Sequence, residues 1–272
     1  MNIINSLLTG IVQGLTEFLP VSSSGHIVLL QALAGINNED LIFEVVLHFA
    51  TLLALLTFFR KDFIEILGSL FQKKVFRKGG IPTAYNSDEN FRLALGIIIG
   101  TIPAGIIGFL LEDTVTKTFN QPVLASVFLI VTGIVLYLTK IVKERKTQRG
   151  IRESFIIGIF QAAAIFPGIS RSGMTISGGL FLGLSRENAV KFAFFLSAPV
   201  ILGVTVKELL NFFSRSIDAG MIVSMIPGFI AAYVSGYLAI KFLIKLAISG
   251  KFYLFSGYCI IVGLISFGYF AL

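Results

Sequence analysis

Charged side chains are scarce in this sequence. Asp, Glu, Lys and Arg make up 14% of the 272 residues, while hydrophobic residues make up 55% and the mean hydropathy is +0.89. A soluble domain carries about 25% charged residues, because water must wet its surface. So few charges exclude a soluble globule of this size and predict an all-α polytopic membrane protein whose surface faces lipid.

Cysteine and acidic residues are scarce as well. The single cysteine, Cys259, excludes an intrachain disulfide, and we interpret it as a small buried hydrophobic residue. With only 15 Asp and Glu, any carboxylate inside an apolar stretch is a candidate functional group. The net charge of +7 does not indicate a nucleic-acid partner, because 12 of the 22 basic residues gather in segments 60–78 and 140–152.

Long apolar runs are what the sequence has in abundance. A helix needs roughly 20 mostly apolar residues to cross a bilayer. Six transmembrane helices are predicted, over residues 41–59, 93–111, 123–142, 189–213, 222–243 and 252–272. Because basic loops stay in the cytoplasm, and because two spans separate the two basic segments, both lie on the cytoplasmic side and the C-terminus lies outside.

Two further segments, 3–34 and 154–184, are apolar at both ends but polar in the middle. The middle of the first reads EFLPVSSSGH (17–26), and that of the second reads FPGISRSG (166–173). Broken helices at membrane depth must be buried in protein or line a wet cavity, since bare backbone cannot face lipid. We therefore predict two re-entrant helical hairpins, the first entering from outside and the second from the cytoplasm.

The two broken segments also resemble each other. Residues 10–25 (GIVQGLTEFLPVSSSG) and 158–173 (GIFQAAAIFPGISRSG) match at 7 of 16 positions without gaps. We interpret this as a duplication within a single membrane domain, 1–272, with repeats at about 1–145 and 150–272. Each repeat has three spans, an odd number, so the second repeat crosses the membrane in the opposite orientation to the first. We therefore predict an inverted-topology repeat whose hairpins meet near the midplane.

The first hairpin carries a buried acid. Gln13 and Glu17 are four residues apart and share one helix face, which leads to the serine-rich break. One carboxylate beside an amide suits a divalent cation, Mg²⁺ or Ca²⁺, whose other ligands are water and phosphate oxygens. A structural ion pair with a distant Lys or Arg is the alternative for Glu17.

Hydroxyl groups and a histidine follow the acid. Ser22, Ser23 and Ser24 offer donors and a nucleophile, Gly25 allows close backbone approach, and His26 can carry a proton. A serine-rich turn that only caps the next helix is the alternative reading. We interpret the other histidine, His48, as a packing residue, because it stands alone in an apolar span.

The second hairpin carries a cation instead. Arg171 offers a permanent charge and two parallel donors. Hydroxyls and a glycine surround it at the start of a helix, where backbone amides favour anions; these are Ser170, Ser172, Gly173 and Thr175. The alternative is that Arg171 only neutralises Glu17. Face to face, the two hairpins predict a phosphoryl-transfer site.

The chain resembles the undecaprenyl-diphosphate phosphatase family of the bacitracin-resistance type. The resemblance rests on two motifs: Gln13 with residues 17–26, and residues 167–175 (PGISRSGMT). The resemblance runs from residue 3 to the C-terminus. It implies a divalent-metal-dependent enzyme of the bacterial inner membrane that hydrolyses undecaprenyl diphosphate to the monophosphate and phosphate, renewing the lipid carrier of cell-wall synthesis. It also implies a site open to the periplasm.

The same resemblance implies roles for individual residues. Glu17 matches the essential glutamate of the family, and Gln13 is the first residue of its Glu/Gln-x-x-x-Glu motif. Ser23 is the expected nucleophile, with His26 as the essential histidine, and a direct attack by His26 is the alternative. Arg171 is the expected phosphate-binding arginine. Ser24 stands where many members have threonine, and it keeps the hydroxyl.

The sequence is also compatible with a transport function. Inverted repeats with broken helices are also typical of secondary transporters. Glu17, His26 and Arg171 would then bind a translocated anion or polyprenyl phosphate, as in a transporter or flippase. The expected partners are the polyprenyl diphosphate substrate and membrane lipid; a homodimer is compatible with the sequence, which does not specify the oligomeric state.

Overall fold

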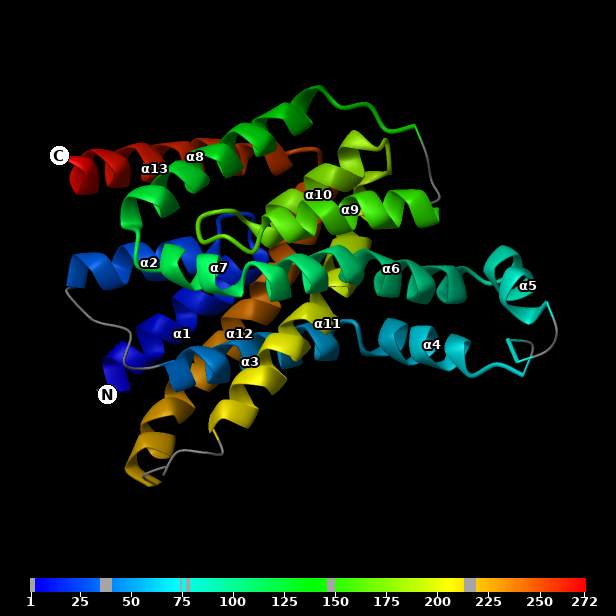
Figure 1. The fold of residues 1–272 in the computed structure, drawn as a ribbon, viewed down its shortest axis with the longest axis horizontal. Helices are drawn as coiled ribbons and strands as arrows, with labels where there is room; N and C mark the ends of the chain where they lie inside the picture. The colour runs from blue at the N-terminus through cyan, green and yellow to red at the C-terminus, as the bar shows by residue number, and fades with distance from the viewer. Residues whose placement is uncertain (1–2, 35–40, 74, 77–78, 146–149, 213–218) are drawn as a thin grey trace.

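A computed structural model describes residues 3–34, 41–73, 75–76, 79–145, 150–212 and 219–272 (Figure 1). All the secondary-structure elements in these ranges are helices. Those of the first half are α1 (Ile3–Phe18), α2 (Ser23–Ala34), α3 (Leu41–Phe58), α4 (Arg60–Leu70), α5 (Gly80–Ser87), α6 (Glu89–Leu110), α7 (Glu112–Thr118), α8 (Pro122–Leu138) and η1 (Thr139–Ile141). Those of the second half are α9 (Ile151–Ala163), α10 (Arg171–Phe181), α11 (Arg186–Phe212), α12 (Ala219–Ile248), η2 (Phe252–Leu254) and α13 (Phe255–Ala271).

Five apolar helical stretches in the described residues are long enough to cross a membrane. They are Glu89–Leu110, Pro122–Ile141, Arg186–Lys207, Val223–Ile248 and Phe252–Ala271. A sixth span results if α3 and α4, which are bent by 82° at Phe59, are counted together. The five stretches overlap five of the six predicted spans, and α3 overlaps the remaining one, 41–59. Large apolar side chains such as Phe109 (80% exposed) cover their outer faces, so the protein is a multi-pass membrane protein.

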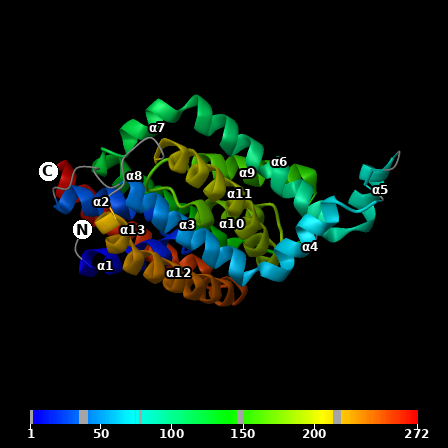
Figure 2. The same ribbon diagram turned by 90° about the horizontal axis from the view of Figure 1, so that it is seen from below.

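The segments between the predicted spans contain the short helices α4, α5 and α7, which hydropathy did not indicate. Figure 2 shows α4 and α5 projecting beyond the bundle at the end opposite the C-terminus. Asp88 separates α5 from α6 and caps α6, because its carboxylate accepts a hydrogen bond of 3.0 Å from the backbone N–H of Phe91. The end of α4 and the starts of α6 and α9 lie towards this same end of the molecule, and the chain that follows α8 runs towards it (Figure 1).

Both segments with polar centres are broken helices. α1 and α2 extend from the middle of the bundle towards the end with the C-terminus, whereas α9 and α10 extend towards the opposite end (Figure 1). α1 packs along α12, and α9 packs along α6. Glycines allow these contacts: a Cβ on Gly10 would lie 2.2 Å from the carbonyl oxygen of Gly228, and one on Gly158 would lie 2.4 Å from that of Gly100.

The contact between α8 and α13 is reciprocal. A Cβ on Gly133 would lie 3.0 Å from the carbonyl oxygen of Ser256. A Cβ on Gly263 would lie 2.9 Å from the carbonyl oxygen of Ser126. As the residue numbers rise along α8, those of its contacts on α13 fall, so the two helices run antiparallel, and a glycine of each packs against the backbone of the other.

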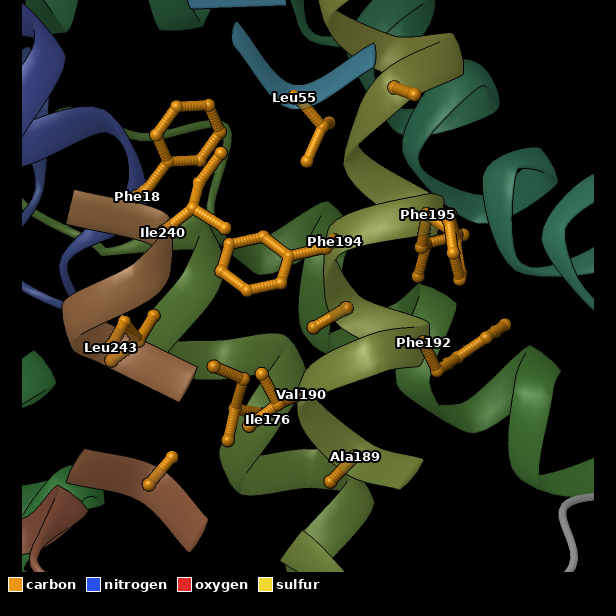
Figure 3. Packing of buried hydrophobic residues seen from close by; sticks show 14 of the residues in the cluster. Phe18, Leu55, Ile176, Ala189, Val190, Phe192, Phe194, Phe195, Ile240 and Leu243 are labelled. Carbon is orange, nitrogen blue, oxygen red and sulfur yellow. The ribbon is translucent and has the colours of Figure 1, made fainter. Parts of the chain in front are cut away.

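A hydrophobic cluster lies beside the first break. Phe18, Phe194 and Ile240 meet there from α1, α11 and α12, with Leu55 of α3 above them (Figure 3). The rings of Phe18 and Phe194 pack edge to face with centroids 5.9 Å apart. Because Phe18 directly follows Glu17, this packing fixes the end of α1 that carries the acid. Cys259 belongs to the same cluster and is fully buried, as predicted.

Candidate functional site

The first break is formed by a proline and a strained serine. α1 ends at Phe18, shortly before Pro20, which has no N–H to continue a helix. Ser22 has φ 67°, the one positive φ of a non-glycine residue in the described chain. Its hydroxyl accepts a hydrogen bond of 3.2 Å from the N–H of Gly25, so that α2 begins with a serine cap.

The second break repeats this cap. α9 ends at Ala163, Gly168 adopts φ 97°, and α10 begins after Ser170. The hydroxyl of Ser170 accepts a hydrogen bond of 3.1 Å from the N–H of Gly173. The same serine and glycine spacing thus starts α2 and α10, which explains why these positions match in the two motifs.

The two breaks are in direct contact. The hydroxyl of Ser22 also accepts a hydrogen bond of 3.1 Å from the N–H of Gly168. Ser172 donates a hydrogen bond of 3.1 Å to the carbonyl of Leu19. A Cβ on Gly25 would lie 2.8 Å from the Cα of Gly168, so only glycine allows the two backbones to approach this closely. The predicted convergence of the two motifs is therefore present.

The Glu17 carboxylate is the centre of this contact. Its Oε1 pairs with Nη2 of Arg171 from the other hairpin. Its Oε2 accepts hydrogen bonds from the hydroxyl of Ser23 at 2.8 Å and from Nε2 of Gln13 at 3.0 Å. The side chain of Glu17 is 1% exposed and that of Arg171 is 20% exposed. The acid, the serine and the guanidinium thus form one buried cluster in which the negative charge is neutralised.

His48 also belongs to this cluster, and its interpretation as a packing residue is wrong. Its Nδ1 lies 3.1 Å from Nε2 of Gln13 and 3.5 Å from Oε2 of Glu17. The sequence contained one signal, namely that an imidazole in an apolar span needs a polar partner. It did not say which helix supplies that partner, because α1 and α3 meet only through the tertiary fold.

His26 follows the first break in sequence, near the start of α2. Its Nδ1 lies 2.8 Å from the carbonyl oxygen of Ser22, and its Nε2 lies 2.8 Å from the hydroxyl of Tyr258. Tyr258 belongs to α13 and was not anticipated from the sequence. No sequence motif links the two residues, which are 232 positions apart.

The remaining predicted residues surround the breaks in different ways. Ser24 lies with its hydroxyl 3.4 Å from that of Ser22, and the hydroxyls of Ser170 and Ser172 are 3.3 Å apart. Thr175 is 1% exposed, and its hydroxyl donates a hydrogen bond of 2.8 Å to the carbonyl of Arg171 within α10. The structure therefore places the Thr175 hydroxyl against its own helix and not beside Glu17.

Thr132 of α8 supports the second break and was missed by sequence reasoning. Its hydroxyl donates to the carbonyl of Gly168 at 2.9 Å and accepts from the N–H of Ser170 at 3.1 Å. Both are backbone groups of the loop that precedes Arg171. The threonine therefore satisfies buried polar groups that no helix can pair, and it fixes where α10 begins.

The metal-ligating potential of the site rests on an amide and one acid. Within the described ranges, no group of three or more His, Cys, Asp or Glu side chains could hold a metal ion. Gln13 is 1% exposed, and its Oε1 is buried without a hydrogen-bond partner. An amide oxygen of this kind is a suitable ligand for Mg²⁺ or Ca²⁺, with water and phosphate oxygens completing the shell.

Comparison with known proteins gives a match over almost the whole chain. The family model described as "Bacitracin resistance protein BacA" matches residues 6–265. A protein named undecaprenyl-diphosphatase from Desulfosudis oleivorans is 43% identical over 271 residues, which cover 97% of this chain and 97% of that protein. Proteins of the same name from Methanobrevibacter smithii and Thermosipho africanus are each 41% identical, covering 98% and 97% of this chain and 97% and 98% of their own lengths.

Proposed function

The chain belongs to the bacitracin resistance protein BacA family, and we propose that it is a membrane phosphatase that hydrolyses undecaprenyl diphosphate to undecaprenyl phosphate and inorganic phosphate. Relatives about 40% identical over nearly their full length carry the name of this activity. The observation that carries the proposal is the Glu17 carboxylate, which contacts the Ser23 hydroxyl and the Arg171 guanidinium at once. Recycling of the lipid carrier and bacitracin resistance follow from this activity.

Ser23 is the nucleophile in this proposal, and Glu17 is its base. The Ser23 hydroxyl already donates to Oε2 of Glu17 at 2.8 Å, which is within reach for proton transfer. The Ser23 oxygen bonds to the terminal phosphorus while its proton passes to Glu17. The bond from that phosphorus to the bridging oxygen breaks, and undecaprenyl phosphate leaves with the electron pair. Water then attacks the phosphoserine, releasing phosphate and restoring the hydroxyl.

The position of His26 favours a serine over a histidine nucleophile. The Ser22 carbonyl engages one ring nitrogen and the Tyr258 hydroxyl engages the other. Neither nitrogen is therefore free to attack phosphorus without losing a hydrogen bond. His26 instead serves as an acid–base group beside the break.

Arg171 and the start of α10 bind the phosphates. The guanidinium has five N–H donors, and the pairing with Glu17 leaves several of them for phosphate oxygens. The first turn of α10 adds backbone N–H groups and the positive end of a helix dipole. Ser170, Ser172 and Gly173 shape this turn through the serine cap, so we assign them to the phosphate site.

A divalent cation, Mg²⁺ or Ca²⁺, is part of the proposal. Gln13 Oε1 and the Glu17 carboxylate would hold it from the protein side, and the unpartnered buried Oε1 supports this assignment. When bound, the cation neutralises charge on the substrate phosphates. Glutamine in place of a second acid leaves one protein charge at the site, so much of the cation's coordination would come from the substrate and from water.

An inverted repeat with two re-entrant hairpins explains the helix contacts. By the matching motifs, α9 is the equivalent of α1. α1 packs against the long helix α12 of the second half, and α9 packs against the long helix α6 of the first half. With basic linkers in the cytoplasm, the first hairpin opens to the outside, so we place the site on the periplasmic face of the bacterial inner membrane.

Phosphate release from purified, detergent-solubilised protein tests the proposal. Hydrolysis without a gradient or a second compartment distinguishes a phosphatase from a transporter or flippase. We expect Ser23→Ala and Glu17→Gln to lose nearly all activity, while Ser87→Ala in the distant helix α5 keeps it. A phosphoserine trapped at Ser23 supports the route, and wild-type rates in Ser23→Ala contradict it.

A further inference from the structure

The hydrogen bond between His26 and Tyr258 joins the first break to the last helix of the chain. His26 Nε2 and the Tyr258 hydroxyl are 2.8 Å apart. Their rings are nearly parallel, inclined by 8°, with centroids 5.6 Å apart. Tyr258 is 46% exposed.

The other side of the imidazole determines which nitrogen carries the proton. Nδ1 of His26 lies 2.8 Å from the Ser22 carbonyl oxygen, which can only accept a hydrogen bond. Nδ1 is therefore the protonated nitrogen of the neutral ring, and Nε2 holds the lone pair. The Tyr258 hydroxyl must then donate to Nε2; when the ring is charged, the same hydroxyl can turn and accept.

Both anchors of the imidazole are rigid. The Ser22 carbonyl is fixed by the left-handed backbone of Ser22 and by the two backbone N–H groups that bond to its hydroxyl. Tyr258 is held by the packing of α13 on α8, where Gly133 and Gly263 allow the backbones to approach closely. A side chain held at both ends in this way keeps one orientation and one tautomer.

We propose that Tyr258 is a positioning residue for the reaction: with the Ser22 carbonyl on Nδ1–H, its hydroxyl on Nε2 holds the His26 ring in one orientation, and it turns to accept from Nε2–H when the ring takes up the proton that the reaction moves. This inference rests on the proposed phosphatase activity, in which His26 is an acid–base group. Tyr258 acts through His26 and needs no contact with the diphosphate. Its loss therefore lowers kcat and leaves KM for the lipid unchanged.

The test compares Tyr258→Phe with Tyr269→Phe in the full-length protein. Tyr269 lies on the same helix, is 68% exposed, and serves as the matched control for removing a tyrosine hydroxyl from α13. For Tyr258→Phe we expect kcat to fall about tenfold, the rate equivalent of one hydrogen bond to a functional group, with KM unchanged. Tyr269→Phe keeps both constants.

A second measurement observes the imidazole itself. The chain has only two histidines, so ¹⁵N-histidine labelling gives two ring systems, and a His48→Gln sample assigns them. We expect wild-type His26 to carry its proton on Nδ1, and the Nε2 resonance to shift in Tyr258→Phe but not in Tyr269→Phe. This readout needs no substrate, so it separates failure of the inference from failure of the proposed function.

Three results would overturn the inference. The first is a proton on Nε2 of His26 in the neutral wild-type ring. The second is a His26 spectrum that Tyr258→Phe leaves unchanged, whatever happens to the rate. The third is a shifted spectrum with an unchanged kcat. If wild-type protein releases no phosphate at all, the proposed function fails, and the spectra still decide whether the Tyr258 hydroxyl holds Nε2 of His26.

Discussion

Replacing Arg171 by methionine removes the partner of a carboxylate that has almost no access to water. The Glu17 side chain is 1% exposed, so an unpaired charge there cannot be solvated. Breaking a buried ion pair from one side costs about 3–5 kcal/mol. The reverse change, Glu17→Gln, leaves the guanidinium unpaired, but the Arg171 side chain is 20% exposed and can reach water. We therefore expect Arg171→Met to destabilise the protein more than Glu17→Gln.

The double variant Glu17→Gln/Arg171→Met removes both charges. It should be more stable than Arg171→Met alone, because no unpaired charge remains, although it is inactive. The ion pair between Lys207 and Glu112 is the matched control, since its N–O distance is 2.5 Å but its side chains are 52% and 51% exposed. Lys207→Met should change the stability by less than about 1 kcal/mol.

Cys259 provides the assay for these changes. It is the only cysteine and is fully buried, so a thiol-reactive fluorophore labels it only as the protein unfolds. At about 2–4 °C per kcal/mol, the loss in Arg171→Met corresponds to a midpoint about 10 °C lower. A midpoint within about 2 °C of wild type for Arg171→Met, or a double variant no more stable than that single variant, contradicts the buried pair.

Three further outcomes follow from the site. Gly25→Ala places a Cβ 2.8 Å from the Cα of Gly168 and should lower the same unfolding midpoint, by about 1–3 kcal/mol of stability, whereas Gly257→Ala on α13, with nothing within 4 Å, should not. His48→Leu removes the acceptor next to Gln13 Nε2 and should slow phosphate release about tenfold, whereas His48→Gln, which keeps an acceptor, should lose less. Chelation of divalent cations should abolish phosphate release until Mg²⁺ or Ca²⁺ is added back, and Gln13→Leu should raise the cation concentration needed for half-maximal rate.

The sequence alone predicted the membrane spans and the contact between the two polar motifs. Apolar length alone located the spanning helices, because lipid requires it. The duplication indicated that Glu17 and Arg171 approach each other, since matching breaks in opposite halves converge. The hydrogen bond of the Thr175 hydroxyl was also predictable. A threonine inside a helix often donates to the carbonyl four residues earlier, which here is that of Arg171.

Contacts between helices that are distant in sequence were not predictable. His48 meets Gln13 across 35 residues, and Tyr258 meets His26 across 232. A hydropathy value averaged over a span does not single out one polar side chain, and neither His48 nor Tyr258 belongs to a motif. The 82° bend at Phe59 is a similar case, because the apolar run simply ends there while the chain continues as a second helix. These features depend on which faces pack together, and a single sequence does not record that.

The two breaks share a serine cap but differ in charge, and this difference is what makes their contact stable. At an offset of 148, the serine caps Ser22 and Ser170 are the same, as are Gly25 and Gly173. Glu17 has no acidic counterpart, and Arg171 stands where the first hairpin has an uncharged serine. Two identical acidic hairpins meeting at one point would place like charges together in a buried site, which is strongly unfavourable. Only breaks that differ at these positions can supply both the acid and the guanidinium, so the shared caps set where α2 and α10 begin while Glu17 and Arg171 supply the charges.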